Sequence, residues 1–464
     1  MLFFKPLILV VIATRAQAAS WIVPGAVWTD TAGNKIDAHG GNVVQRGDTF
    51  FWVGQSASQN EKALMYSSTD LLNWTPLGVQ NSLEYLWRPK IAKPNGSFWV
   101  MLYTGNLGSD GPQLKVFMLI QGKQIYGQLN RNIQSMVSTQ MVGGYKLNGA
   151  AVTVPPNSYT YSDTGMFQDS DGTWYILTSA DHNIVQINKI NSDGTIGARA
   201  SQLAAGAYEA PGILKVGSTY YLIVSGKTGW RSNPNKVFTS SSINGPWTGG
   251  ADIAPEAEKT YNSQNTFELT IAGNKATTYV YMGDSWDSKG GPNSNHVWLP
   301  IKVDSAKKTL TLDYHAMWKV DIKTGVVSFP AAGKRYEAEH AEIIGRGEAA
   351  HCRGCLSKRA VYKIDGNSEV VFRNVTGNGR KQWVSFHYEV NSREAGEAHI
   401  FINSESVPTN ISSLNSRAGY HKTVPVMVSL DRGNQNAVRF GANGGKDFKV
   451  TIEGIEVFDD DEEL

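Results

Sequence analysis

An apolar run, a glycine-centred turn and an aromatic-rich run recur five times within roughly the first three hundred residues. The runs have the length of single strands, and glycine accepts the positive φ that tight hairpins require. The turns are centred on Gly47, Gly96, Gly172, Gly217 and Gly273. The pattern therefore predicts five antiparallel hairpins in series.

The spacing of these hairpins favours a radial β architecture. The turns recur about every fifty residues, which is the length of four short strands with their turns. One interval is longer, and the polar, glycine-rich segment around Gln121 to Pro156 is expected to hold the insertion. We predict a five-bladed β-propeller. A β-sandwich is the alternative, although it would give irregular spacing.

A second pattern of alternating strands follows the propeller region. Segments such as EVVFRNV, WVSFHYEV and VPVMVSL alternate at the period of a half-buried strand. Their number and total length predict a small, jelly-roll-like β-sandwich, so the whole chain is expected to be all-β. The expected parts are a signal peptide (1–18), the propeller (19–327), a linker (328–334), the β-sandwich (335–458) and an acidic tail (459–464).

The net charge and the N-terminal sequence indicate the cellular compartment of the protein and exclude some classes of partner. A formal net charge of +2 over 464 residues gives no electrostatic basis for nucleic-acid binding. Lys5, a short apolar stretch and then Ala16-Gln17-Ala18 predict a secretory signal peptide, because the stretch is too short to span a membrane. We expect a secreted monomer. Four N-glycosylation sequons agree with secretion: Asn73, Asn95, Asn374 and Asn410.

The chain has two cysteines, Cys352 and Cys355. A zinc site would need further cysteine or histidine ligands at suitable spacing, and the sequence offers none nearby. In an oxidising compartment, a disulfide that closes a small loop is the favoured interpretation.

One residue of each repeat should reach the propeller axis, eight or nine residues before the turn glycine. Glu209 opens an apolar strand, where partial desolvation would raise its pKa and suit a general acid. Asp163 is equivalent one repeat earlier, and its negative charge would help to keep a proton on Glu209. The five axial residues are His39, Trp87, Asp163, Glu209 and Gln264.

The residues alone give an acid and a modulator but no base. Glycoside hydrolysis normally needs a second carboxylate as base or nucleophile. Asp37, Glu84 and Glu268 are close in sequence but out of phase with the strand starts. Non-catalytic interpretations of both carboxylates also stay open. Glu209 can be a solvated residue at a strand end, and Asp163 can be a turn residue.

Five ordered segments, AHGGNVVQRGDTFFWVG, WRPKIAKPNG, SDTGMFQDSDGTWYILTS, YEAPGILKVGSTYYLIVS and SQNTFELTIAG, resemble glycoside hydrolase family 43. More narrowly, they resemble its exo-β-1,3-galactanase (galactan 1,3-β-galactosidase) branch. The resemblance covers most of residues 25–300 and implies an inverting hydrolase of β-1,3-galactan with no catalytic cofactor. It implies Glu209 as acid, Asp163 as pKa modulator and Gln264, in an imidic acid form, near the attacking water. The missing aspartate base is typical of this branch.

Two positions depart from the pattern of the branch. Trp87 stands where a glutamate is common, and Asp37 stands where a glutamine is expected. Tryptophan cannot accept a hydrogen bond from a sugar hydroxyl, but it can stack on a sugar face. We expect substrate contacts from His39 and from three tryptophans, Trp87, Trp230 and Trp286, with core packing as the alternative for the last two. A family 43 enzyme acting on arabinan or xylan, or a catalytically weak galactan-binding protein, are the other candidate functions.

The C-terminal region, about residues 335–458, resembles carbohydrate-binding module family 35. Glutamates stand near both of its ends, and that resemblance implies that Glu337, Glu339 and Glu453 hold a structural calcium ion. From the residues alone, exposed strand charge is the favoured explanation. Asn443, in the loop GANGG, is expected to contact sugar.

Overall fold

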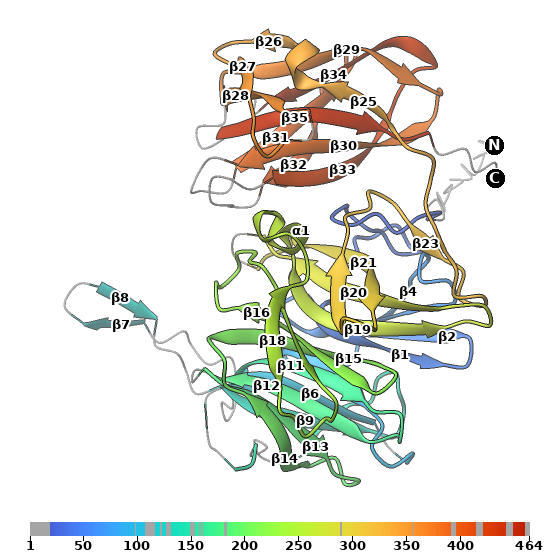
Figure 1. The fold of residues 1–464 in the computed structure, drawn as a ribbon, viewed down its shortest axis with the longest axis vertical. Helices are drawn as coiled ribbons and strands as arrows, with labels where there is room; N and C mark the ends of the chain where they lie inside the picture. The colour runs from blue at the N-terminus through green and yellow to red at the C-terminus, as the bar shows by residue number, and fades with distance from the viewer. Residues whose placement is uncertain are drawn as a thin grey trace, which may run out of the picture.

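The computed structural model is built almost entirely of β-strands (Figure 1). The expected signal peptide lies outside the described residues. The structure describes residues 19–459 except 98, 107–116, 121–122, 127–130, 149–153, 157–158, 160, 181–182, 288–289, 356, 391–395, 414–420 and 442–448.

Five four-stranded antiparallel sheets form the first domain. Blade 1 contains β1 (His39–Arg46), β2 (Thr49–Gln55), β3 (Ala63–Ser68) and β4 (Thr75–Val79). Blade 2 contains β5 (Trp87–Ala92), β6 (Trp99–Asn106), β9 (Arg131–Ser138) and β10 (Lys146–Leu147). Blade 3 contains β11 (Tyr161–Gln168), β12 (Trp174–Ala180), β13 (Val185–Ile190) and β14 (Ile196–Leu203). Blade 4 contains β15 (Tyr208–Val216), β16 (Thr219–Gly226), β17 (Lys236–Ser240) and β18 (Thr248–Asp252), and blade 5 contains β19 (Gln264–Ala272), β20 (Thr277–Ser285), β21 (Asn295–Asp304) and β22 (Thr309–Leu312).

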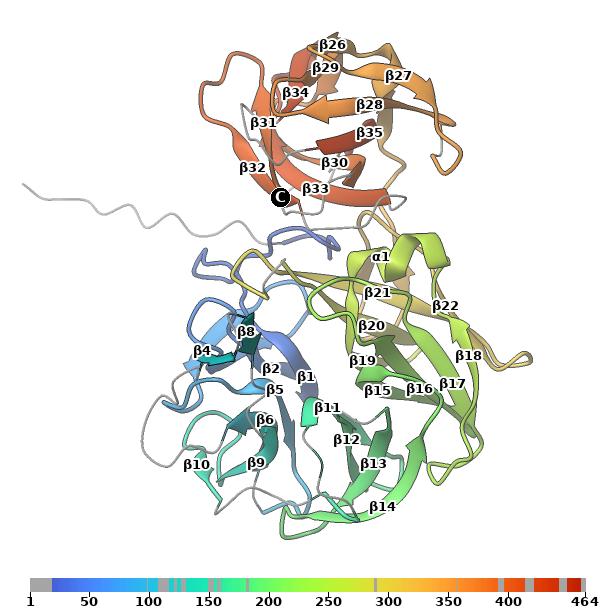
Figure 2. The same ribbon diagram turned by 90° about the vertical axis from the view of Figure 1, so that its left-hand side faces the viewer.

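The first strands of the five sheets surround a common axis, as Figure 2 shows. Each contacts the first strand of the next blade, and β19 contacts β1, so the ring closes. A bridge between Ile22 and Trp318, with Ile22 N–H donating to the Trp318 carbonyl at 2.8 Å, joins the two ends of the domain. The domain is the predicted five-bladed propeller, and the alternative of a sandwich for this region is wrong.

The predicted glycine turns connect the first two strands of the blades. Gly47 and Gly217 both have a φ of 58°. Each lies in a two-residue connection, since Arg46 pairs with Thr49 and Val216 pairs with Thr219. Such connections need positive φ, which glycine adopts without strain.

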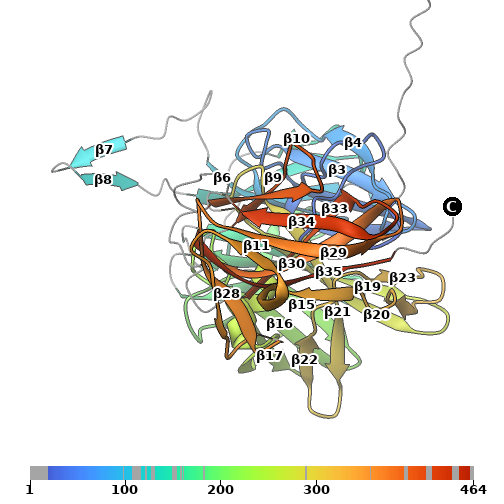
Figure 3. The same cartoon turned by 90° about the horizontal axis from the view of Figure 1, so that it is seen from above.

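The extra segment of the second blade lies earlier than the sequence suggested. Strands β9 and β10 fall inside the range predicted as an insertion, yet they are regular strands of blade 2. The additional element is a hairpin, β7 (Phe117–Ile120) and β8 (Lys123–Tyr126), which projects away from both domains in Figures 1 and 3. Polar residues between the buried Ile133 and Met136 hid the strand pattern of β9.

Helical structure is confined to single turns in the described part of the chain. These are η1 (Glu256–Glu258) and α1 (Lys259–Asn262) before β19, and η2 (Ala338–His340) in the second domain. No described helix has the length and apolar character needed to cross a membrane. A short hairpin, β23 (Lys319–Val320) and β24 (Val327–Ser328), ends the propeller region.

The second domain is a sandwich of two antiparallel sheets. One sheet contains β27 (Glu348–His351), β28 (Arg359–Asp365), β35 (Lys449–Val457), β30 (Lys381–Val390) and β33 (His421–Ser429), with β25 (Lys334–Glu337) beside β35. The other contains β26 (Glu342–Ile344), β29 (Glu369–Gly377), β34 (Gly433–Gly441), β31 (Gly396–Ile402) and β32 (Thr409–Ser413). Apolar side chains of both sheets form the core, where Phe386 stacks on Phe440 at 5.6 Å between ring centroids.

A small apolar cluster joins the two domains. Phe458, which follows β35, packs with Val23, Ala26 and Met317 of the propeller domain. The Phe458 N–H also donates to the Trp383 carbonyl at 2.9 Å, so the end of the sandwich is fixed at the junction.

We expect Phe458→Ala to destabilise the protein by about 3 kcal/mol, because the substitution leaves a cavity in a packed cluster. Thermal unfolding would measure the loss. Val407→Ala, which changes a side chain that is 76% exposed, is the matched control and should stay within about 0.5 kcal/mol of the parent. Equal melting temperatures for the two variants would show that the junction cluster contributes nothing.

Candidate active site

A β-bulge interrupts every inner strand where the strand reaches the axis. Bulges re-aim side chains and are common next to active sites. The irregular steps fall between His39 and Asn42, Trp87 and Lys90, Tyr161 and Thr164, Glu209 and Gly212, and Asn265 and Phe267. The predicted axial residues therefore lie at or beside five equivalent bulges.

Three bulges contain a residue with positive φ. The values are 64° for Gly40, 49° for Arg88 and 51° for Ala210. Glycine adopts this conformation freely, whereas arginine and alanine are strained in it. The two strained residues are Arg88 itself and Ala210, which directly follows Glu209. Strain at these places points to a functional requirement for the directions of the Arg88 and Glu209 side chains.

Gln264 lies at the centre of the polar network. Its Oε1 accepts hydrogen bonds from Arg88 Nη2 at 2.5 Å and from Trp286 Nε1 at 2.9 Å. Its Nε2 donates to Glu209 Oε1 at 3.0 Å and to Ser225 Oγ at 3.2 Å. All four hydrogen-bonding positions of the amide are therefore engaged.

Asp163 lies beside Glu209 and is held by two donors. Its Oδ1 is 3.0 Å from Arg88 Nε, and its Oδ2 accepts the Ala210 N–H at 3.0 Å. The second contact links the carboxylate to the residue that follows Glu209. The structure thus brings the three predicted catalytic residues into one network, through an arginine that the prediction did not assign.

Burial raises the pKa of Glu209 to about 8, and the charge of Asp163 acts in the same direction. Arg88, Lys227 and the hydrogen bond from Gln264 oppose the shift. Glu209 is therefore protonated at neutral pH, as a general acid must be. Because Oε1 accepts from Gln264, the acid proton belongs on Oε2.

The contacts of Gln264 fix its amide form in this state. Arg88 and Trp286 can only donate to Oε1. An imidic acid would place an O–H group against those two N–H groups. The imidic role implied by the resemblance therefore requires Gln264 to exchange partners when substrate and water enter.

His39 opens the inner strand of blade 1 and is completely buried. Its Nδ1 is 2.9 Å from Asp284 Oδ1, and His296 Nδ1 is 3.1 Å from the same oxygen. The two imidazoles stack at 4.4 Å, and His39 lies 5.2 Å from Trp286. In this state His39 supports Trp286, so the direct sugar contact expected from its axial position is not open to it.

The group His39, Asp284 and His296 also has the spacing of metal ligands, the only such group among the described residues. Both histidines direct Nδ1 at the carboxylate, and Thr266 Oγ1 donates to its other oxygen at 2.6 Å. These hydrogen bonds account for the group as a carboxylate–histidine network.

Three tryptophans from different blades form an aromatic row that begins at Gln264. Trp286 is almost fully buried against Gln264, whereas Trp230 and Trp87 are half-buried. The ring centroids of Trp286 and Trp230 are 5.0 Å apart, and those of Trp230 and Trp87 are 6.1 Å apart. Trp87 Nε1 donates to the carboxylate of Glu61.

The three carboxylates that are close in sequence to the axial residues lie outside the network of Glu209 and Gln264. Asp37 accepts hydrogen bonds from the loop that follows β2, including Ser56 Oγ at 2.6 Å. Glu84 is 3.4 Å from Lys62. Glu268 is buried deeper along β19, and burial raises its pKa to about 7. None of the three makes a described contact with Glu209 or Gln264.

Sequence reasoning missed Arg88, Ser225 and Asp284. Arg88 was visible as a charged residue inside the segment WRPK, at the entrance of an inner strand. Ser225 and Asp284 lie near the ends of the second strands of blades 4 and 5, which return to the axis opposite the first strands. A search of both strands of each hairpin would have included them.

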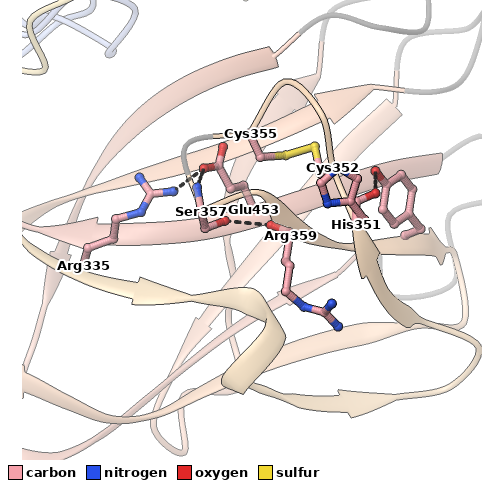
Figure 4. Close-up of a disulfide and its surroundings, with 8 residues drawn as sticks. Arg335, His351, Cys352, Cys355, Ser357, Arg359 and Glu453 are labelled. Carbon is pink, nitrogen blue, oxygen red and sulfur yellow. Dashed lines mark hydrogen bonds and ion pairs between the residues drawn. A yellow bond between two sulfur atoms is a disulfide. The ribbon is translucent and has the colours of Figure 1, made fainter.

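The three predicted calcium ligands of the second domain contact arginines. Arg335 lies 2.7 Å from both Glu337 Oε1 and Glu453 Oε1, and Arg359 pairs with Glu339. Glu453 also accepts the Ser357 N–H at 3.0 Å, beside the Cys352–Cys355 disulfide (Figure 4). The sulfur atoms of that disulfide are 1.96 Å apart.

As arranged, these glutamates do not fit a calcium ion, because the guanidinium of Arg335 joins the two carboxylates that the ion would share. A bound cation would have to displace it. Glu337 Oε2 is buried without a hydrogen-bond partner, so one carboxylate oxygen is available as a ligand for a cation. Calcium binding stays a prediction, and Asn443 lies outside the described residues.

A buried, protonated carboxyl group beside a second carboxylate, close to three tryptophans, is typical of a glycoside hydrolase. A sequence profile of the glycosyl hydrolases family 43 matches residues 35–266, which is half of the chain and contains Asp163, Glu209 and Gln264. The chain belongs to glycosyl hydrolase family 43.

Solved structures agree with this assignment. The exo-β-1,3-galactanase of Phanerochaete chrysosporium, in its galactose complex, is 28% identical with a TM-score of 0.78, over 95% of this chain and 100% of that one. A glutamate-to-glutamine variant of that enzyme in complex with β-1,3-galactotriose gives a TM-score of 0.79 at the same identity and coverage. An exo-β-1,3-galactanase of Clostridium thermocellum, 22% identical with a TM-score of 0.58 over 93% of this chain and 99% of that one, supports the fold. No curated protein matches the sequence.

The raised pKa of Glu209 predicts an alkaline limit near pH 8 for kcat/KM. The acid must be protonated, so activity falls as the pH rises through this value. Asp163→Asn removes a negative charge that raises the pKa, so the limit should move to lower pH by about one unit. A pH–rate profile of both proteins measures this. An unmoved alkaline limit in the variant would contradict the proposed electrostatic coupling.

The contacts of Arg335 predict that this arginine neutralises the carboxylates of Glu337 and Glu453 when no cation is bound. Arg335→Ala should lower stability by about 1–2 kcal/mol, because two carboxylates lose a charged partner. Arg373→Ala, which removes an exposed pair with Glu342, is the control and should have little effect. A melting temperature that falls with EDTA and recovers with calcium would instead support the ion implied by the resemblance.

Proposed function

We propose that the protein is an exo-acting β-1,3-galactanase that releases galactose from β-1,3-galactan backbones such as those of arabinogalactans. The supporting observation is the network in which protonated Glu209 contacts Gln264 and lies beside Asp163. The 28% identical galactanase that carries galactose or galactotriose in its solved structures supports the choice of sugar.

In the proposed mechanism, Glu209 donates its proton to the glycosidic oxygen while water attacks the anomeric carbon with inversion. Asp163 keeps the proton on Glu209 before the reaction and stabilises the positive charge that develops on the sugar. Gln264 positions the water after it gives up one of its present contacts, and in its imidic acid form it accepts the proton that the water loses before that proton passes to solvent.

The arrangement argues against the arabinan or xylan alternative with an aspartate base. The axial position of blade 1 holds His39, which is buried and bound to Asp284. The carboxylate of Asp37 is committed to the loop after β2.

We propose secretion for the same enzyme, from the apolar N-terminal segment and the sequons. The second domain is proposed as a galactan-binding module of family 35. Its attachment would raise the local concentration of substrate at the pocket.

Purified protein should release galactose from β-1,3-galactan, with the α-anomer formed first, as proton NMR can follow. Glu209→Gln should lower kcat by about 10²- to 10⁴-fold, because the general acid is lost. Asp304→Asn, which changes a 42% exposed side chain at the end of β21 in blade 5, is the control and should retain full activity. Binding of galacto-oligosaccharides by the parent protein without turnover would instead favour the galactan-binding alternative.

A further inference from the structure

A cavity of about 300 Å³ lies between the propeller and the β-sandwich. We propose that this cavity is a second carbohydrate-binding site, which takes a galactosyl unit of the galactan chain. Its volume is at the lower end of the range for small-molecule sites, about 300–1,000 Å³, and such sites are common where two domains meet. The choice of sugar rests on the proposed function.

Both domains supply the lining of the cavity. The propeller contributes residues of α1, the end of β20 and the start of β21, and the sandwich contributes residues of β30, β32 and β33. Figures 1 and 2 show α1 below β33, and these two elements are in contact. The lining residues do not include Asp163, Glu209 or Gln264, so the cavity is distinct from the catalytic network.

The lining has the chemistry of a site for a neutral, hydroxyl-rich ligand. It contains four asparagines and three serines or threonines, whose side chains can donate and accept hydrogen bonds. Tyr261, Tyr314 and Trp383 add aromatic surface that suits the C–H face of a sugar. Among the described lining residues, only Lys35 is charged, and its Nζ donates to the carbonyls of Pro292 at 2.7 Å and Ser294 at 2.6 Å.

Asn295 offers the cavity an acceptor without a partner. Its Nδ2 donates to the Gly25 carbonyl at 3.2 Å, which sets the orientation of the amide. Its Oδ1 is buried and accepts no hydrogen bond within the described residues. A buried acceptor of this kind is costly unless a donor reaches it. A sugar hydroxyl can supply that donor, whereas an apolar ligand cannot.

A strained turn presents two of the lining residues. All four residues of α1, Lys259–Asn262, have positive φ, between 45° and 58°. Runs of non-glycine residues in this conformation are unfavourable, and such strain is found at ligand clamps and other functional sites. The surrounding structure enforces it, since the buried Thr260 Oγ1 accepts the Asn235 N–H at 2.8 Å. The strained turn thereby places Tyr261 and Asn262 in the lining.

The same turn leads into the catalytic network. Asn262 stands two residues before Gln264, and Ser285, another lining residue, directly precedes Trp286. Asn262 Nδ2 donates to Ser285 Oγ at 2.9 Å, as Trp286 Nε1 does to Gln264 Oε1. One pair of segments therefore supports both the cavity and the catalytic amide.

The first test is a crystal structure of Glu209→Gln with β-1,3-galactotriose, because loss of the acid should prevent cleavage. The protein is produced in a host without N-glycosylation, since the sequon residue Asn410 lines the cavity. We expect sugar in the axial pocket and in the cavity, with a hydroxyl at hydrogen-bond distance from Asn295 Oδ1. Sugar in the pocket beside an empty cavity overturns the second site and leaves the galactanase function intact. Absence of sugar from both places overturns both proposals.

The second test measures binding of β-1,3-galactotriose in solution by calorimetry, with Glu209→Gln as the parent. Thr409→Trp fills part of the cavity from an exposed position of β32, whereas Val407→Trp adds the same side chain at an exposed position outside the lining. Thr409→Trp should remove one binding site, and Val407→Trp should retain it. Asn295→Ala should weaken the same site by about 3- to 10-fold, the value of a neutral hydrogen bond. Unchanged binding in Thr409→Trp and Asn295→Ala overturns the proposal.

Discussion

The arrangement of the catalytic side chains depends on the contacts that the Arg88 guanidinium makes with Asp163 and Gln264. The guanidinium joins Asp163 of blade 3 to Gln264 of blade 5. Arginine stays charged even when buried, so it balances the negative charge that Asp163 brings next to Glu209. A strand bulge makes this possible, because it breaks the strict alternation of side chains and lets Trp87 lie in the pocket wall while Arg88 reaches the axis. The positive φ of Arg88 is the strained conformation that this change of direction requires.

Repetition along the chain made much of the fold predictable. A hairpin with a fixed glycine turn is a local feature, and five copies at similar spacing predict both the blades and the residues nearest the axis. The same counting grouped Asp163, Glu209 and Gln264 from the order of residues alone. It could not show that His39 is sealed behind Trp286, because burial depends on how neighbouring blades pack. The insertion within the longer interval was also assigned to the wrong residues, because the sequence of β9 is polar and shows little of the apolar alternation of a strand.

Contacts between distant segments account for what local patterns could not predict. In the sequence, Asp37 and Glu84 were considered only as candidate bases and were set aside. In the structure, Asp37 binds the start of the loop that carries Glu61, and Glu84 pairs with Lys62 at the end of that loop. Arg335 and Glu453 meet because β25 pairs with β35 across the whole second domain. In each case, sheet pairing or loop closure determines which residues come into contact, and no short sequence motif predicts that contact.

The saturation of Gln264 has a consequence for the order of events in the pocket. Its Nε2 holds Glu209 Oε1 while Oε2 carries the proton, so the acid is oriented before substrate arrives. A sugar that binds against Trp286 and Gln264 must replace one of the amide contacts. Loss of the Glu209 contact would remove an interaction that lowers the pKa of that group. Substrate entry would then keep Glu209 protonated and free Gln264 for water in the same movement, which couples binding of the sugar to the protonation state that a general acid needs.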